Sequence, residues 1–163
     1  MTTIVMGLGN PLMGDDGVGL AALARLEDGP PFDDVEFVEG ATWGLSLLPM
    51  IERADRLILV DAITAGARPG EIVELARDRL PVYLSRKLSP HQVDIRDALA
   101  VAELRGRMPG EVVAIGVEPE SIDMRTSLSD PVERALDALV GRVVAQLERW
   151  GHTYSVAGGP ADA

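Results

Sequence analysis

The 163-residue sequence contains no cysteine. Disulfide bonds, zinc–thiolate sites and iron–sulfur clusters are therefore excluded, and any metal must be held by oxygen and imidazole ligands. Imidazole is scarce as well, because the chain has only 2 histidines, His91 and His152. A cysteine-free chain is typical of a reducing compartment, so we expect a cytoplasmic protein.

Long apolar runs are also missing. No uninterrupted run approaches the roughly 18 residues of a membrane span, and the N-terminus lacks a basic segment followed by an apolar stretch. Basic residues are few, since 15 Lys and Arg oppose 26 Asp and Glu and leave a net charge of −11. This charge disfavours phosphate-rich partners. We therefore expect a soluble protein that binds neither membranes nor nucleic acid.

The segments that are present alternate between short aliphatic runs and longer helical patterns. This alternation predicts an α/β fold of three layers, a mostly parallel, twisted five-stranded sheet with helices on both faces. Several runs are apolar without alternation, as expected for strands that are covered on both sides. The predicted strands are residues 4–8, 35–38, 57–60, 71–75 and 112–117. The predicted helices are residues 16–26, 45–53, 90–105 and 131–150.

The length predicts a single domain. Residues 1–150 form it, and residues 151–163 are rich in Gly, Ala and Pro, so we expect them to fray as a flexible tail. The last helix has a clear start signal, with Asp130 as N-cap, a proline at the first position and Glu133 as the capping-box partner. Trp150 is expected to pack at the end of this helix.

Three metal-competent side chains occur at turns that follow apolar runs. Asp16 lies in the loop that leaves the first strand, and Asp61 directly follows the third. Both belong to the carboxyl edge of the sheet, where ligands bind in open α/β folds. His91 lies in the first turn of a helix, whose dipole favours the neutral imidazole that a metal requires. The three residues form a candidate metal triad.

Each residue also has a purely structural interpretation. Asp15 and Asp16 are well placed to cap the helix that follows them, the commonest role of Asp before an apolar periodic segment. Asp61 equally suits a buried structural hydrogen bond, and His91 a bond to a loop carbonyl. His152, beyond the last helix, is expected to be solvated.

The ordered segments GLGNPLMGDDGVG (7–19), EGATWG (39–44), VDA (60–62), SPHQ (89–92), IGVEPE (115–120) and SLSDPVERAL (127–136) resemble those of the hydrogenase maturation endopeptidases. The resemblance covers almost the whole chain except the tail. It implies a nickel-dependent protease that removes a C-terminal extension from the precursor of a [NiFe] hydrogenase large subunit. The family's metal-binding triad maps onto Asp16, Asp61 and His91.

The resemblance also assigns the remaining site residues. The family usually has Asp-Gly-Gly-Thr after the second strand, where this chain has Glu39, Gly40, Ala41 and Thr42, so a catalytic role proposed for that Asp falls to Glu39. Asp16 and Asp61 are expected to take part in catalysis as well as in metal binding. The expected substrate-binding residues are Gly9, Asn10, Gly40 and Thr42. Trp43, in the same loop, is expected to pack in the core or at its rim in preference to contacting the substrate. Oxygen and nitrogen ligands suit nickel, zinc or cadmium, and the resemblance makes nickel, delivered by the substrate, the relevant ion.

Two alternatives belong to other functional classes. The string GLGNP also opens the peptidyl-tRNA hydrolases, but the Asn- and His-bearing segment that follows in that family is missing here. A non-catalytic nucleotide-binding module is the second alternative, because Gly7 and Gly9 stand at a strand end. The third glycine of the dinucleotide fingerprint is replaced by Leu12.

Overall fold

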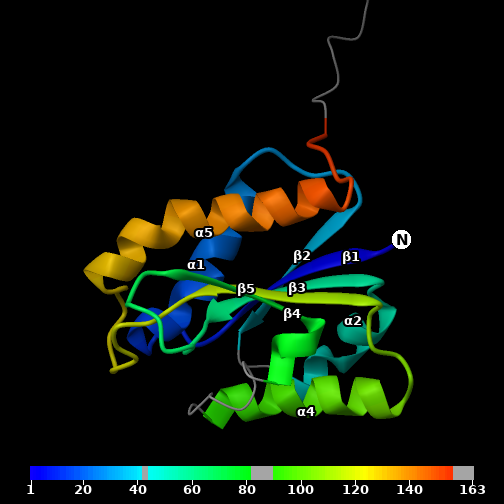
Figure 1. Ribbon diagram of the computed structural model, residues 1–163, viewed down its shortest axis with the longest axis horizontal. Helices are drawn as coiled ribbons and strands as arrows, with labels where there is room; N and C mark the ends of the chain where they lie inside the picture. Colours follow the sequence, from blue (N-terminus) through cyan, green and yellow to red (C-terminus); the bar gives the residue numbers. More distant parts are fainter. Residues whose placement is uncertain (42–43, 82–89, 156–163) are drawn as a thin grey trace, which may run out of the picture.

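The computed structural model describes residues 1–41, 44–81 and 90–155, with the backbone alone for residues 90–94. A five-stranded sheet lies between two layers of helices, as Figure 1 shows. The strand order is β2-β1-β3-β5-β4, in which β4 runs antiparallel to β5 and the other neighbours are parallel. The predicted α/β architecture is confirmed. The strands are β1 (Thr3–Leu8), β2 (Val35–Ala41), β3 (Arg56–Ala62), β4 (Ile72–Ala76) and β5 (Glu111–Val117).

Helices α1 and α5 cover one face of the sheet, and α2 and α4 cover the other (Figure 1). The first two predicted helices each begin as a 3-10 turn before they become α-helical. The α-helices are α1 (Val18–Asp28), α2 (Leu48–Arg53), α4 (Pro90–Leu104) and α5 (Asp130–Arg149), and the 3-10 helices are η1 (Gly14–Gly17), η2 (Gly44–Leu47) and η3 (Arg77–Arg79). No helix among the described residues has the length and apolar character needed to cross a membrane.

The central strand β3 explains how the two helical layers are held. Leu57 and Leu59 pack toward α2 and α4, whereas Ile58 and Val60 pack toward α1 and α5. All four are fully buried. Because both faces of the strand are covered, its apolar run shows no alternation, as the sequence indicated.

The start of α5 differs from the prediction by one residue. Ser129 is the N-cap, and Asp130 lies inside the first turn. The Ser129 hydroxyl does not cap the helix but donates to Oδ2 of Asp15 at 2.8 Å. A contact with a distant part of the chain therefore overrides the local capping pattern.

The chain beyond α5 is packed as far as residue 155, which contradicts the predicted fraying for that part of the tail. The Tyr154 and Phe32 rings lie 4.3 Å apart, and the Ser155 amide donates to the carbonyl of Pro31 at 2.7 Å. His152 is not solvated as expected, because its Nε2 lies 2.8 Å from Oγ1 of Thr3. Residues 156–163 lie outside the described residues.

Trp150 packs at the end of α5, as predicted. It lies against the cluster of apolar side chains between the sheet and the α1–α5 layer. Arg56, at the start of β3, stacks 5.5 Å from the centre of its ring and donates to its carbonyl oxygen at 2.8 Å. These contacts fix the helix end to the amino-terminal edge of the sheet, opposite the candidate site.

Candidate active site

The first loop turns away from β1 at Gly9, which has a φ of +110°. A side chain at this position would overlap the carbonyl oxygen of Asp16, and its Cβ would lie 3.3 Å from Oδ1 of Asp61. The Gly9 amide donates to the carbonyl of Ala41 at 3.0 Å. Only glycine fits here, because the backbone is left-handed and three segments of the chain meet around it.

The carboxylates of Asp16 and Asp61 both lie beside this turn. Oδ2 of Asp16 accepts a hydrogen bond from the Asn10 amide at 3.0 Å, and Oδ1 of Asp61 accepts one from the Ala62 amide at 2.8 Å. Each residue is 1% exposed. Two buried carboxylates thus lie beside the Gly9 turn at the carboxyl edge of the sheet, and buried carboxylates are costly unless they are paired or functional.

A small pocket opens beside Asp61 on the face that α4 covers. Its wall includes Ile95 of α4, and His91 is one helical turn before Ile95. Positions four residues apart lie on one face of a helix. The other residues that line the pocket are Leu8, Gly9, Ala41, Gly44 and Leu47.

The structure describes only part of the predicted metal triad. The structure places Asp16, Asp61 and the backbone of α4 at this edge, but the His91 side chain lies outside the described part of the chain. Within the described residues, no group of three His, Cys, Asp or Glu side chains is arranged to hold a metal ion. Metal binding by all three residues therefore stays a prediction. Thr42, which was expected to bind the substrate, and Trp43 also lie outside the described residues.

Asp15 differs from its neighbour Asp16. It is fully buried, and its Oδ1 accepts from the Ser129 amide at 2.7 Å. Oδ2 accepts from the amides of Glu120 and Ser121, at 2.8 and 3.1 Å, and from the Ser129 hydroxyl. Neither η1 nor α1 has a side-chain hydrogen bond at its cap, so the capping interpretation of the two aspartates is wrong. Asp15 instead holds the loop between β5 and α5 against the first loop.

The structure does not bring Glu39 to the two carboxylates. Glu39 is exposed on β2, where it pairs with Gly7. A Cβ on the next residue, Gly40, would meet Leu8 and Met6 at 2.8 and 2.9 Å, on the face of the sheet that α4 covers. Because successive residues of a strand face opposite sides, Glu39 points to the side away from α4.

The remaining predicted binding residues have different environments. Gly40 is buried, and its missing side chain leaves room for the core, so packing explains this glycine. Asn10 is partly exposed next to Asp16, and its Oδ1 accepts from the Leu12 amide at 3.0 Å. Asn10 therefore lies beside the candidate site, whereas Gly40 has a packing role in the neighbouring core.

Glu118 was not singled out from the sequence. It follows β5 at the same edge, is 6% exposed, and its Oε2 accepts from the Ala65 amide at 2.7 Å. A carboxylate directly after a buried strand was the signal that identified Asp61, and the same signal was available here. Glu118 therefore fixes the loop that leaves β3 after Asp61.

Comparison with known proteins identifies the family of this chain. The family model of the HycI hydrogenase maturation protease matches residues 21–146. The hydrogenase 2 maturation protease of Escherichia coli (strain K12) is 32% identical over 153 residues, covering 93% of each chain. The HupD hydrogenase expression/formation protein of Rhodobacter capsulatus is 34% identical over 151 residues, covering 91% of this chain and 72% of the relative.

Solved structures give the same result. The hydrogenase maturating endopeptidase HybD from E. coli superimposes with a TM-score of 0.88 at 32% identity, covering 93% of this chain and 95% of that one. The [NiFe] hydrogenase maturation protease HybD from Thermococcus kodakarensis gives a TM-score of 0.71 at 28% identity, covering 90% and 99%. The family model and the relatives define a peptidase, an enzyme that hydrolyses peptide bonds. The chain belongs to the hydrogenase maturation protease family, which excludes the tRNA-hydrolase and nucleotide-binding alternatives.

Proposed function

We propose that this enzyme removes the C-terminal extension of a [NiFe] hydrogenase large-subunit precursor after nickel has been inserted. The observation that carries the proposal is the meeting of Asp16 and Asp61 around Gly9, at the edge where α4 begins. The names of the relatives give the hydrogenase as the kind of partner.

In this proposal the nickel belongs to the substrate, and Asp16, Asp61 and His91 recognise it. Two carboxylates and one imidazole leave coordination positions open, so the ion keeps ligands from the precursor while it contacts the protease. A cleft of this kind accepts only a precursor that already contains the metal. The isolated protease should hold nickel weakly, because tight binding needs the ligands that the precursor brings.

Peptide hydrolysis requires a water molecule that loses a proton as it attacks the scissile carbonyl. Asp16 and Asp61 lie beside Gly9, and one of them accepts this proton and returns it to the leaving amine as the peptide bond breaks. The chain has no cysteine and no Gly-x-Ser-x-Gly nucleophile elbow, so we propose direct attack by water without a covalent acyl-enzyme. Glu39 takes no part in this scheme, because it faces the other side of the sheet.

The test is incubation with nickel-loaded precursor, followed by mass spectrometry of its C-terminus. Wild-type protein should release the extension, and Asp61→Asn and His91→Ala should not. Glu39→Gln is the matched control, since it also removes one carboxylate charge, and it should process normally. The two inactive variants should keep their stability within about 2 kcal/mol of wild type. Loss of the fold in both would support the structural interpretation, and an inactive Glu39→Gln would return Glu39 to the mechanism.

The source of the metal needs a separate experiment. The protease is stripped with chelator, the chelator is removed, and nickel-loaded and nickel-free precursors are offered in parallel. Cleavage of the loaded precursor alone is expected. Efficient cleavage of the nickel-free precursor would contradict the proposal. Failure to cleave the loaded precursor until metal is returned to the protease would also contradict the proposal, because the catalytic ion would then belong to the protease.

A further inference from the structure

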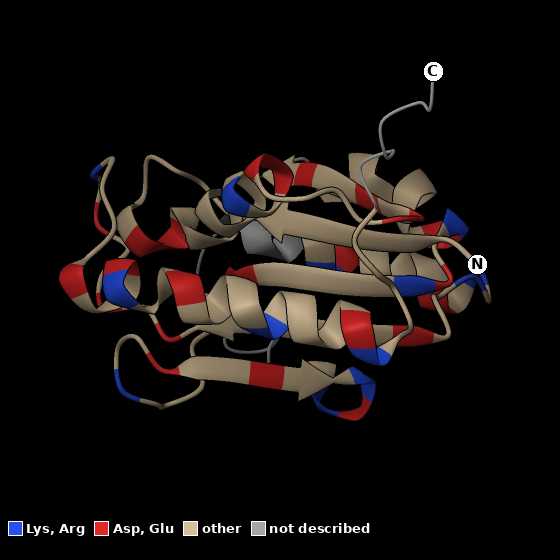
Figure 2. Cartoon of the chain, turned by 90° about the horizontal axis from the view of Figure 1, so that it is seen from above, with Lys and Arg blue, Asp and Glu red and all other residues tan. Residues whose placement is uncertain are grey.

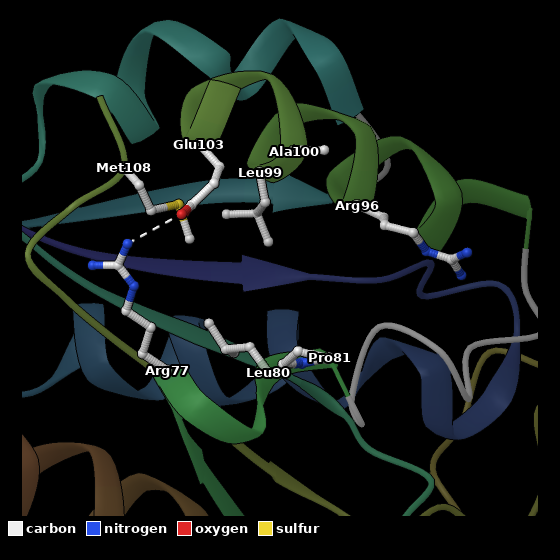
Figure 3. A pocket seen from close by; sticks show the side chains of 8 residues that line it. All are labelled: Arg77, Leu80, Pro81, Arg96, Leu99, Ala100, Glu103 and Met108. Carbon is white, nitrogen blue, oxygen red and sulfur yellow. Dashed lines mark hydrogen bonds and ion pairs between the residues drawn. The ribbon is translucent and has the colours of Figure 1, made fainter. Parts of the chain in front are cut away.

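A second pocket, of about 310 Å³, lies between η3 and the flank of α4 (Figure 3). Its apolar part is formed by Leu80, Leu99 and Met108. Arg77 and Arg96 stand at opposite ends of it in Figure 3, with the leucines between them. The volume reaches the lower limit of ordinary ligand pockets, and apolar walls with a few charged groups are typical of them.

The two arginines differ in their partners. Arg77 pairs with Glu103 at 3.2 Å and donates to the carbonyl of Pro109 at 3.3 Å. Arg96 has no ion-pair partner among the described residues, and its Nε is buried without a hydrogen bond to them. Because this Nε is closed to solvent, a ligand carboxylate would pair with the terminal nitrogens of the guanidinium, whose charge no described carboxylate neutralises.

The net negative charge of the chain bears on what this pocket can bind. Acidic positions outnumber basic ones across the elements drawn in Figure 2, in keeping with the net charge of −11. Most of the surface therefore repels an anionic peptide. Arg96, whose guanidinium pairs with no described carboxylate, lies beside an apolar wall and attracts an anion locally. It favours a segment that carries both an apolar side chain and a carboxylate.

The pocket is also close to the candidate active site. Arg96 follows His91 by five residues in α4, which is about 7.5 Å along the helix axis. Ile95, its neighbour in the chain, lines the pocket that contains Asp61. An extended peptide advances about 3.3 Å per residue, so about two to three residues cover this distance along the helix.

We propose that this pocket binds the part of the precursor that lies beyond the scissile bond, the extension that is removed. An apolar side chain of the extension packs on Leu80, Leu99 and Met108, and a carboxylate pairs with Arg96. The inference rests on the proposed function and names the part of the substrate that is held. It assigns Arg96 to substrate binding and not to the chemical step.

The test compares Arg96→Gln with Arg134→Gln. Arg134 is exposed on α5, across the sheet, so this control removes the same charge away from the pocket. Binding of a fluorescent peptide with the sequence of the extension is measured by anisotropy, and kcat and KM are measured with nickel-loaded precursor. Arg96→Gln should weaken peptide binding and raise KM about tenfold with kcat unchanged, because one charge-assisted bond is lost. Arg134→Gln should match wild type.

A second variant guards against misfolding at Arg96. Ala100 lines the same pocket and is exposed, so Ala100→Glu should leave the helix intact while it fills the pocket and repels a carboxylate. It should weaken peptide binding as Arg96→Gln does, and circular dichroism should show an unchanged fold. Two further peptides locate the carboxylate, one with a C-terminal amide and one with its acidic side chains changed to amides. One of them should bind wild type as weakly as the original peptide binds Arg96→Gln.

The outcomes separate the two proposals. If wild type cleaves the precursor but Arg96→Gln and Ala100→Glu leave KM and peptide binding unchanged, the binding site for the extension is refuted. The same conclusion follows if both altered peptides bind wild type as tightly as the original. If wild type fails to cleave a nickel-loaded precursor, the proposed function itself is refuted.

Discussion

Asp15 and Asp16 are adjacent and identical in type, yet the structure gives them separate tasks, and Asp15→Asn tests this division. The substitution keeps the size of the side chain and removes its charge. The Asp15 carboxylate accepts four hydrogen bonds from the segment 120–129, through both of its oxygens. An amide has only one oxygen, so its NH₂ group must face a donor whichever way it is turned.

The number and type of these hydrogen bonds determine how much the substitution lowers the free energy of unfolding. With its oxygen in the Oδ2 position, the amide of the Asp15→Asn variant keeps three bonds in neutral form and loses the bond from the Ser129 amide, which then opposes another donor. A bond to a charged group contributes about 1.5–3 kcal/mol, and neutral bonds are roughly half as strong as charge-assisted ones. Burying an amide is easier than burying a carboxylate, which offsets part of the loss. We expect the free energy of unfolding to fall by about 2–4 kcal/mol.

Urea denaturation measures this change. With a slope of about 2 kcal/mol per M, the expected loss lowers the midpoint by about 1–2 M. Asp123→Asn is the control, because Asp123 is exposed on the same loop, and it should leave the free energy of unfolding within about 0.5 kcal/mol of wild type. A loss below about 1 kcal/mol for Asp15→Asn would refute the argument, since the four bonds would then contribute little.

Three further substitutions test other parts of the structure. Gly9→Ala should abolish processing, because the new methyl group overlaps a backbone carbonyl of the first loop, and an active variant would contradict the turn described at Gly9. His152→Ala should lower stability by about 1 kcal/mol without changing kcat, as thermal melting and a processing assay would show. Hydrogen bonds from Arg53 lower the pKa of Glu36 below 4.5, so this exposed pair stabilises the protein above that pH and the contribution is lost as the pH falls through the lowered pKa. The stabilities of wild type and Glu36→Gln should differ by less than about 1 kcal/mol at neutral pH, and the two melting temperatures should converge at acid pH, below the lowered pKa of Glu36.

The strands could be predicted because the middle of the sheet is buried on both faces. Residues 57–60 form a continuous apolar run, and the observed β3 extends this run to Arg56 and Ala62. The ends of the strand were missed because Arg56 and Asp61 are charged and interrupt the apolar run that identified it. Asp61 lies inside the strand, where it pairs with Gly116 of β5, and only the sheet reveals this pairing.

The sequence was enough to place Asp16 and Asp61 at one edge of the sheet, but it did not distinguish the contacts of the individual carboxylates. Asp61 was found because a carboxylate after a buried strand must be paired or used. Asp15 and Asp16 could not be separated, since the partners of Asp15 are more than 100 residues away along the chain. Local propensity carries no information about such contacts, and for the same reason the anchoring of residues 151–155 was missed.

The catalytic role that the family resemblance assigns to Glu39 depends on the register of strand β2. The β1–β2 pairing shifts between Gly7 and Leu8, so that Leu8 pairs with Ala41 and Gly40 lies in the irregularity. A shift of one residue moves a side chain to the other face of a sheet, and it would bring Glu39 to the face of Asp61. The amino-acid sequence of the motif is identical in either register, so the motif alone does not distinguish the two registers. The Glu39→Gln assay therefore distinguishes two arrangements of one short segment. Normal processing fits the register observed here, and loss of processing requires the end of β2 to be rearranged when the precursor binds.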